Sequence, residues 1–316
     1  MVERELSLVN EGLRGIVECA GPEINAVGDY IFNGSGKRIR PALFLTAAYR
    51  VDVSSDHLID AAIALELIHT ASLLHDDVID QAAIRRGKEA VHVKWGNKIS
   101  VLSGDYLLSQ AFKILVNYNK PELLEVVVDI VEKMSEGEIE QAFASIDSNN
   151  LESRYFQWIG KKSAAFFSGC CKAGSLMRDG SKEEQAAWME YGYNLGMAFQ
   201  LIDDLLDYTG KKSITGKPLY GDLNNRVITL PLIRTINVSS MNKPVNEHFI
   251  TDTATSSQIG EVAQAVIDGE GPHYTYQKAE YYVECAAALI DDLNPESEEQ
   301  KAILKQIPRD VLMRRN

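Results

Sequence analysis

Apolar residues recur at three- and four-residue steps along most of the chain, the spacing that lines one face of an α-helix. The segment 58–74 is an example, with mostly such steps between Leu58, Ala62, Leu65, Leu67 and Ile68. The same spacing predicts further helices over residues 101–116, 122–143, 155–177 and 183–208. The alternation typical of strands is scarce, so the pattern predicts an all-α fold of about ten helices.

Proline and loop-forming residues show where these helices end. No proline lies between Pro41 and Pro121, or between Pro121 and Pro218, which leaves room for long helices. Breaks are predicted at 51–55, 84–98, 117–121 and 178–184, and an irregular segment at 237–258. No linker divides the sequence, so we predict a single domain over residues 1–316.

Composition and charge narrow the class of protein. The chain is 45% hydrophobic with a net charge of −13, which excludes a disordered protein. The charge argues against a general nucleic-acid or anionic-membrane surface, and leaves open a local basic cluster. The four cysteines form no CxxC motif, so we expect no disulfide framework and a reducing, cytoplasmic location. No run of 18 apolar residues and no signal-peptide pattern is present, so we expect no transmembrane segment.

Two aspartate motifs end apolar helical segments: DDVID with Asp76, Asp77 and Asp80, and DDLLD with Asp203, Asp204 and Asp207. The outer aspartates of each motif are four residues apart and share a helix face, where two carboxylates repel unless a cation joins them. Carboxylates combined with substrate phosphates suit Mg²⁺. A solvated acidic face is the alternative for either motif alone, but the pair indicates a metal–phosphate site.

Basic residues accompany both motifs, as a phosphate site in an acidic protein requires. The candidates are Lys37 and Arg40 in GKRIRP, Arg85 and Arg86 in RRG, Lys162 beside Ser163 in KKSA, and Lys217 in GKP. His69 lies two helical turns before Asp76 and shares its helix face, although a hydrogen-bonded core histidine is the alternative. Gln200 precedes Asp203 and could donate to a phosphate or orient an aspartate.

These segments together resemble the trans-isoprenyl diphosphate synthases, or polyprenyl synthetases, in particular the bacterial long-chain, octaprenyl-type members. The resemblance covers nearly the whole chain, in the family's order, through GKRIRP, HTASLLHDDVIDQAAIRRG, HVKWGNKISVLSGDYLLSQAF, KKSA, GMAFQLIDDLLDY, TGKPLYGDL and TLPLI. It implies a single large bundle of about ten or more antiparallel helices around a deep central cavity. It also implies a homodimer.

The resemblance implies a role for each candidate residue. The catalytic set would be Asp76, Asp77, Asp80, Asp203, Asp204, Asp207 and Lys162, with Asp76, Asp80 and Asp203 as metal ligands. Isopentenyl diphosphate would be held by Lys37, Arg40, His69 and Arg86. The allylic diphosphate would be held by Arg85, Lys162, Ser163, Gln200 and Lys217. Roughly three Mg²⁺ ions would occupy the site with substrate bound.

Two positions depart from the family pattern. Ser163 stands where the family often has threonine, so a hydroxyl is retained. Arg226 and Val227 stand where many relatives have glycine and lysine, so one expected lysine is missing.

The implied activity is repeated condensation of isopentenyl diphosphate onto an allylic diphosphate such as farnesyl diphosphate. Ala71 and Ser72 are small where short-chain members tend to have aromatic residues, so we expect a long all-trans product of about six to ten units. Octaprenyl diphosphate for quinone side chains is the central expectation, with transient membrane contact for product release. Two alternatives remain: a short-chain farnesyl or geranylgeranyl diphosphate synthase, and a subunit of a heterodimeric polyprenyl synthase. A terpene cyclase would not need a second diphosphate site.

Overall fold

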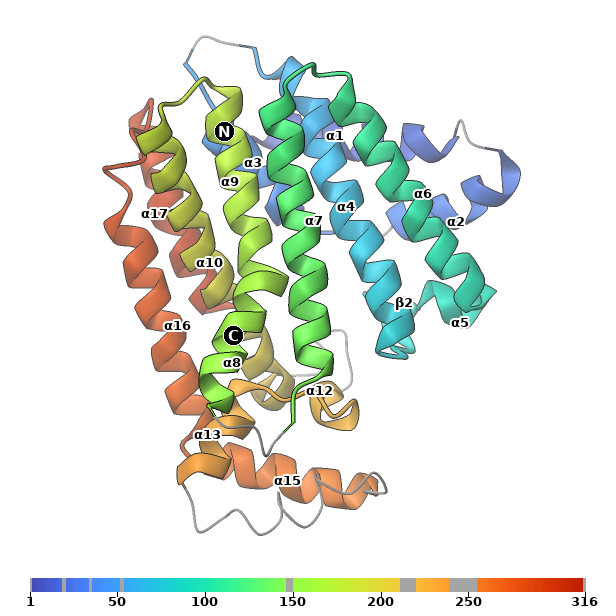
Figure 1. The fold of residues 1–316 in the computed structure, drawn as a ribbon, viewed down its shortest axis with the longest axis vertical. Helices are drawn as coiled ribbons and strands as arrows, with labels where there is room; N and C mark the ends of the chain where they lie inside the picture. Colours follow the sequence, from blue (N-terminus) through green and yellow to red (C-terminus); the bar gives the residue numbers. More distant parts are fainter. Residues whose placement is uncertain are drawn as a thin grey trace. The chain divides into compact units, whose positions relative to one another are not determined.

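The computed structural model describes residues 2–18, 21–33, 36–51, 54–145, 150–210, 220–238 and 255–314, and these are helical nearly throughout (Figure 1). The first part of the chain forms α1 (Glu3–Glu18), α2 (Pro22–Phe32), α3 (Ile39–Ala48), the 3₁₀ turn η1 (Asp56–Leu58), α4 (Ile59–Ile79), α5 (Val91–Trp95), α6 (Asn97–Val116) and α7 (Pro121–Ala142). The remainder forms α8 (Leu151–Ile159), α9 (Ala165–Met177), α10 (Lys182–Thr209), α12 (Gly221–Asn224), α13 (Leu230–Val238), α15 (Ser256–Asp268), α16 (Gly271–Ala288) and α17 (Glu298–Met313). The all-α prediction is confirmed.

One predicted helix is interrupted. The segment 155–177 contains the end of α8, a π-helical turn η2 (Gly160–Ala164) and α9. A close approach by α7 accompanies this turn: a Cβ atom on Gly137 would lie 2.6 Å from the Lys162 amide nitrogen and 2.9 Å from the Trp158 carbonyl oxygen. Apolar spacing cannot distinguish a π turn from an α turn, because one inserted residue barely changes the pattern.

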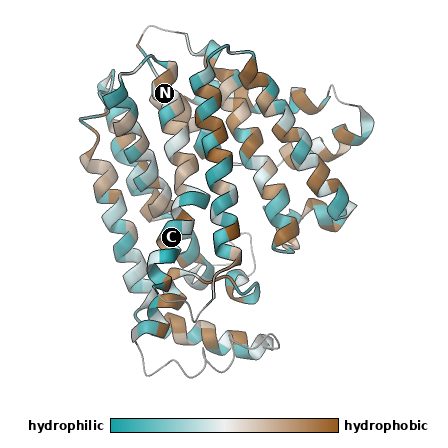
Figure 2. Cartoon of the chain, in the orientation of Figure 1, coloured by the Kyte–Doolittle hydropathy of each residue, from teal (hydrophilic) through white to brown (hydrophobic). Residues whose placement is uncertain are grey.

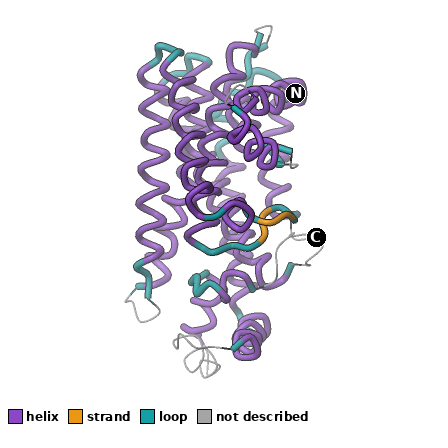
Figure 3. Tube along the Cα trace, turned by 90° about the vertical axis from the view of Figure 1, so that its right-hand side faces the viewer, coloured by secondary structure: helices purple, strands orange, loops and turns teal. Residues whose placement is uncertain are grey.

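The predicted break at 84–98 is also more ordered than expected. It contains a hairpin of β1 (Ile84–Arg85) and β2 (Lys88–Glu89), drawn in orange in Figure 3, followed by α5. Its turn residues Arg86 and Gly87 have φ angles of 51° and 76°, as a two-residue type I′ turn requires. Strands of two residues are too short for an alternating pattern, so the sequence did not reveal them. Most of the predicted irregular segment, 239–254, lies outside the described residues.

The chain divides into two compact units: residues 1–131, 167–192 and 291–302 form unit 1, and the remaining residues form unit 2. In unit 1, α4 packs against α6, α3 and α1, and is buried on most sides. Figure 2 shows the hydrophobic positions along α4 that make this burial favourable. In unit 2, α13 packs against α16, α15 and α8. The single domain over 1–316 stays a prediction.

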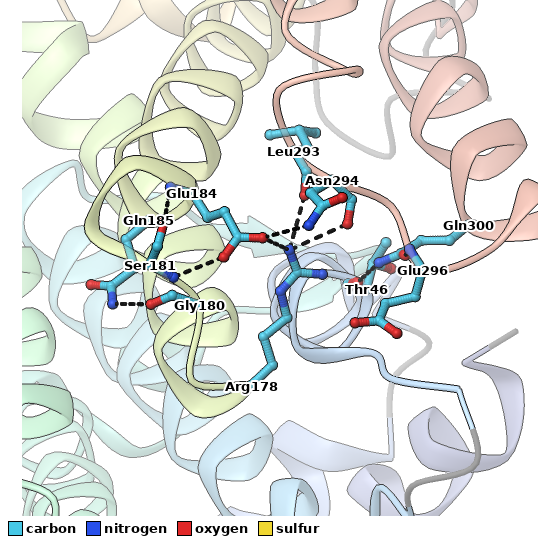
Figure 4. Close-up of polar contacts among 10 residues, drawn as sticks. All are labelled: Thr46, Arg178, Gly180, Ser181, Glu184, Gln185, Leu293, Asn294, Glu296 and Gln300. Carbon is cyan, nitrogen blue, oxygen red and sulfur yellow. Dashed lines mark hydrogen bonds and ion pairs between the residues drawn. The ribbon is translucent and has the colours of Figure 1, made fainter.

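A buried arginine fastens separate segments of unit 1 (Figure 4). Arg178, at the end of α9, donates to the Leu293 carbonyl at 2.9 Å and forms an ion pair with Glu184 at 3.3 Å. Gln300 of α17 donates to the Thr46 carbonyl of α3 at 2.7 Å. These bonds connect the α9–α10 turn with the segment before α17, and α3 with the first turn of α17.

Two helical segments among the described residues are long and apolar enough to cross a membrane by length and composition alone, 56–79 and α6. This is weak evidence for a span, because the core helix of a soluble protein passes the same test. The most apolar window of the first segment is 67% buried, whereas that of α6 is only 28% buried.

Candidate active site

The first aspartate motif lies in unit 1 at the end of α4. Asp76 is half-buried, and Asp80 is the C-cap residue, with its amide donating to the Asp76 carbonyl at 2.8 Å. Asp77 is 2% exposed and accepts a hydrogen bond from Arg85 Nε at 2.7 Å. Arg85 therefore fastens the β1–β2 hairpin to the middle of the motif, and its role toward the allylic diphosphate stays a prediction.

The second motif lies in unit 2 near the end of α10, and its middle aspartate is again buried. Asp204 is 4% exposed and accepts from the Tyr155 hydroxyl at 2.5 Å and from Gln200 Nε2 at 2.7 Å. The Ser163 hydroxyl donates to Gln200 Oε1 at 2.5 Å, which extends the chain of hydrogen bonds to η2. Burial, with the neighbouring charges of Asp203 and Asp207, raises the pKa of Asp204 to about 7.

The outer aspartates of the second motif are more accessible than Asp204. Asp203 keeps 45% of its side chain exposed and lies 3.5 Å from Arg314 Nη2. Asp207 accepts from the backbone amides of Gly221 and Asp222 at 2.9 and 3.1 Å, which places α12 beside it. In both motifs the middle carboxylate is buried and holds neighbouring elements, while the outer carboxylates are only partly buried, and Asp207 also holds α12.

Two residues predicted for the isopentenyl diphosphate site lie together in unit 1. Arg40 Nη1 is 3.0 Å from His69 Nε2, and its guanidinium lies 5.1 Å from the centre of the Phe167 ring. Arginine can only donate, so His69 Nε2 accepts and the imidazole is neutral in this contact. Desolvation of the ring, and then the charges of Arg40 and Arg86, lower the His69 pKa well below its ordinary value.

Arg38 lies near this group, and its buried partners were not predicted from the sequence. It is buried, pairs with Glu66 Oε1 at 2.6 Å and donates to Asn10 Oδ1 at 2.7 Å. Its φ of 49° turns the chain just before α3, beside the exposed Lys37. The signal for this pair was a glutamate within the apolar segment LELIH, because a buried carboxylate needs a cation. Tyr155 and Arg314 were missed as well, and no local motif marks either one.

The lysines of η2 are neutralised by α7 in unit 2. Lys162 Nζ lies 2.5 Å from Glu138 and 3.0 Å from Gln141, while Lys161 pairs with Glu136 and Glu140. A diphosphate binding to Lys162 would therefore compete with Glu138 for its ammonium group. Lys217 lies outside the described residues.

The two aspartate motifs belong to different units of the chain, so each offers its own carboxylates to a metal ion. Within the described part of the chain, no group of three or more histidine, cysteine, aspartate and glutamate side chains could hold an ion by itself. Asp76 and Asp80 supply two accessible carboxylates one helical turn apart. This donor set fits Mg²⁺, which takes one or two carboxylates together with substrate phosphates.

Comparison with known proteins decides the family. The sequence model described as "Polyprenyl synthetase" matches residues 21–266. The chain belongs to this family. This polyprenyl synthetase is 34% identical over 280 residues to the octaprenyl diphosphate synthase of Escherichia coli K12, covering 89% of the chain and 82% of the relative. It is 35% identical over 238 residues to the short chain isoprenyl diphosphate synthase of Methanothermobacter thermautotrophicus, covering 74% and 73%.

A solved structure agrees with this assignment. The polyprenyl synthase from Caulobacter crescentus CB15, complexed with calcium and isoprenyl diphosphate, superimposes with a TM-score of 0.93 at 29% identity. The match covers 100% of this chain and 96% of that one. The resemblance predicted from the sequence is confirmed: the chain is a trans-polyprenyl diphosphate synthase, a prenyltransferase.

Proposed function

We propose that this enzyme uses Mg²⁺ to condense isopentenyl diphosphate repeatedly onto farnesyl diphosphate, making octaprenyl diphosphate for quinone side chains. The observation that carries the proposal is the shared design of the two aspartate motifs. Both are complete, and each exposes its outer carboxylates while a buried middle carboxylate holds its surroundings. A silent subunit of a heterodimeric synthase would be expected to lose aspartates, and all six are present.

In this proposal Asp76, Asp80 and Asp203 are the metal ligands. Bound Mg²⁺ would neutralise the allylic diphosphate as its C–O bond breaks. Arg85 and Lys162 turn from their carboxylate partners toward the allylic diphosphate and bind it. Ser163 and Gln200 also hold this diphosphate, and their hydrogen bonds connect it to Asp204. Lys217 completes this set.

A second group of residues holds isopentenyl diphosphate. Lys37, Arg40 and Arg86 supply the positive charge, while the neutral His69 ring keeps Arg40 in place. The double bond of isopentenyl diphosphate attacks C1 of the allylic substrate, and the departing diphosphate accepts the proton that is lost. Catalysis then comes from positioning and electrostatics, without a nucleophilic side chain.

The two diphosphate sites can be separated by titration. Lys37→Ala and Arg40→Ala should mainly weaken isopentenyl diphosphate, and Lys162→Ala should mainly weaken the allylic substrate, because each removes a cation from one site. Steady-state titration of each substrate measures this. An equal loss for both substrates in every variant would contradict two separate sites.

The long product is supported by the residues before Asp76. Ala71 is fully buried, and Ser72 turns its hydroxyl to the His69 carbonyl at 2.9 Å, so neither side chain adds bulk. A growing chain in a central cavity would pass this turn of α4. The alternative is a short product, and the similarity to the short chain isoprenyl diphosphate synthase of Methanothermobacter thermautotrophicus is the observation that supports it.

A homodimer is supported by α6. This helix is apolar, yet Leu102 is 52% exposed and Val101 39% exposed. A second copy of the chain would cover such a face, since exposed apolar surface of this kind favours association. Replacing Leu102 with lysine should shift the molar mass measured by light scattering from dimer toward monomer.

Transient membrane contact in the cytoplasm is supported by a small aromatic and basic surface. Lys94 Nζ lies 4.0 Å from the centre of the Tyr30 ring and 4.4 Å from that of Trp95. Tyrosine, tryptophan and lysine are the residues typical of membrane interfaces. Flotation with anionic vesicles tests this contact, and no binding would contradict it.

The activity itself is tested with purified protein, farnesyl diphosphate, isopentenyl diphosphate and Mg²⁺. We expect release of diphosphate and, after dephosphorylation, a chromatographic product near octaprenol. A product ending at three or four units would contradict the long-chain proposal while leaving the prenyltransferase assignment intact.

A further inference from the structure

α6 is attached to the turn of α4 that leads directly into Asp76. The Ser100 hydroxyl, fully buried, donates to the Leu74 carbonyl at 2.9 Å. His75 Nε2 donates to the Val101 carbonyl at 3.1 Å and lies 3.5 Å from Asp105 Oδ1. Two consecutive residues before the first aspartate are thus hydrogen-bonded to the same neighbouring helix.

Gly104 makes room for this contact. A Cβ atom at position 104 would lie 2.3 Å from His75 Nε2 and 2.7 Å from its Cδ2. Any larger residue would force the imidazole to turn away, which breaks its hydrogen bond to the Val101 carbonyl. Gly104 follows Ser100 by four residues, so both lie on the face of α6 that meets α4.

We propose that Ser100, Gly104 and His75 form a lock that sets the rotation of α4 and thereby aims the Asp76 carboxylate at the metal–diphosphate. Consecutive side chains on a helix point about 100° apart, so holding Leu74 and His75 fixes the direction of Asp76. The lock rests on the proposed metal-binding role of Asp76. His75, Ser100 and Gly104 are positioning residues, because their bonds reach α4 rather than the substrate.

The hydrogen bonds from Ser100 and His75 are not required for α4 and α6 to pack through their apolar side chains. A carbonyl within a helix already accepts from the amide four residues later, so the Ser100 bond to Leu74 is an additional one. Leu107 and Ala111, which follow Gly104 on the same face of α6, are already buried. The polar contacts are concentrated at the level of the aspartate motif, where a shift of about 1 Å can cost 100-fold in rate.

The test is calorimetric binding of inorganic diphosphate in the presence of Mg²⁺, with thermal melting to confirm that each variant folds. Gly104→Ala should weaken this binding about tenfold. The double variant His75→Ala/Gly104→Ala should bind diphosphate like His75→Ala alone, because the alanine Cβ at position 104 then has no imidazole to clash with. Gly15→Ala on α1 is the matched control, since a Cβ there meets nothing within 4 Å.

Ser100→Ala provides a second route that introduces no clash. It should raise the KM for the allylic substrate and the Mg²⁺ requirement, and leave the KM for isopentenyl diphosphate unchanged. If Ser100→Ala and Gly104→Ala fold and bind Mg²⁺-diphosphate like Gly15→Ala, the lock is refuted. Asp76→Ala distinguishes the metal-binding proposal from the lock. If Asp76→Ala binds Mg²⁺-diphosphate normally, both proposals are overturned. If Asp76→Ala loses this binding while Ser100→Ala and Gly104→Ala keep it, only the lock is overturned.

Discussion

The middle aspartates Asp77 and Asp204 have a different physical task from the aspartates around them. Each is nearly inaccessible and is satisfied by specific donors, Arg85 for Asp77 and Tyr155 with Gln200 for Asp204. A buried carboxylate needs such donors, since desolvation otherwise disfavours its charge. We therefore expect the outer and middle positions to respond differently to substitution.

Asp76→Ala and Asp203→Ala should lower turnover by several orders of magnitude while leaving the melting temperature nearly unchanged, because each removes an accessible ligand rather than core volume. Asp77→Ala should also lower stability, since Arg85 would lose its buried partner. Turnover at saturating substrate and thermal melting measure the two effects. Near-normal turnover of Asp76→Ala at ordinary Mg²⁺ would contradict its role as a ligand.

His69 makes stability depend on pH in a defined direction. Its pKa is lowered in the folded enzyme, so below the ordinary value near 6.5 the unfolded chain binds a proton that the folded chain does not. Stability therefore falls as the pH falls, by up to about 1.4 kcal/mol from this group at pH 5.5.

His69→Gln removes this titration while keeping an acceptor for Arg40. The difference in unfolding free energy between pH 7.5 and 5.5, measured with urea, should be smaller in the variant than in the wild type. Equal differences in both proteins would show that His69 does not titrate in this way.

At the scale of elements, glycine decides where helices can meet. Gly137 lets the backbone of α8 and η2 approach α7 so closely that a side chain would not fit. This approach holds the turn that carries Lys162 and Ser163. The π turn therefore lies directly against α7, and it carries two residues of the proposed allylic diphosphate site.

Gly137→Ala should destabilise the enzyme by about 1 to 3 kcal/mol through overpacking, and should raise the KM for the allylic substrate by displacing Lys162. Urea unfolding and steady-state titration measure both effects. Gly260→Ala in α15 is the control, because a Cβ there meets nothing within 4 Å and should be neutral or stabilising. Matching results for the two variants would contradict the close-approach argument.

At the scale of the whole molecule, we expect product length to depend on side-chain volume along α4. Ala71→Tyr should shift products to about three to five isoprene units without abolishing the first condensation, because the added bulk lies before the metal ligands. Chromatography of dephosphorylated products from wild type and variant checks this. Unchanged products would show that Ala71 does not face the growing chain.

The sequence by itself determined the helical class, the approximate positions of the long helices and the two aspartate motifs. These are local properties: apolar periodicity, proline spacing and carboxylates at four-residue steps act within one helix. The resemblance to the polyprenyl synthetases could also be recognised from the sequence, because the family's segments lie in order along nearly the whole chain.

Only the tertiary structure decided which carboxylates are buried and which partners they take. Asp76 and Asp77 are adjacent and chemically identical in sequence, and burial on one side of α4 separates them. The Arg38–Glu66 pair, the Tyr155 bond to Asp204, the π turn beside Gly137 and the contact of His75 with Gly104 all join residues far apart in the chain. Such contacts arise from packing between elements, and no local pattern encodes the distance between them.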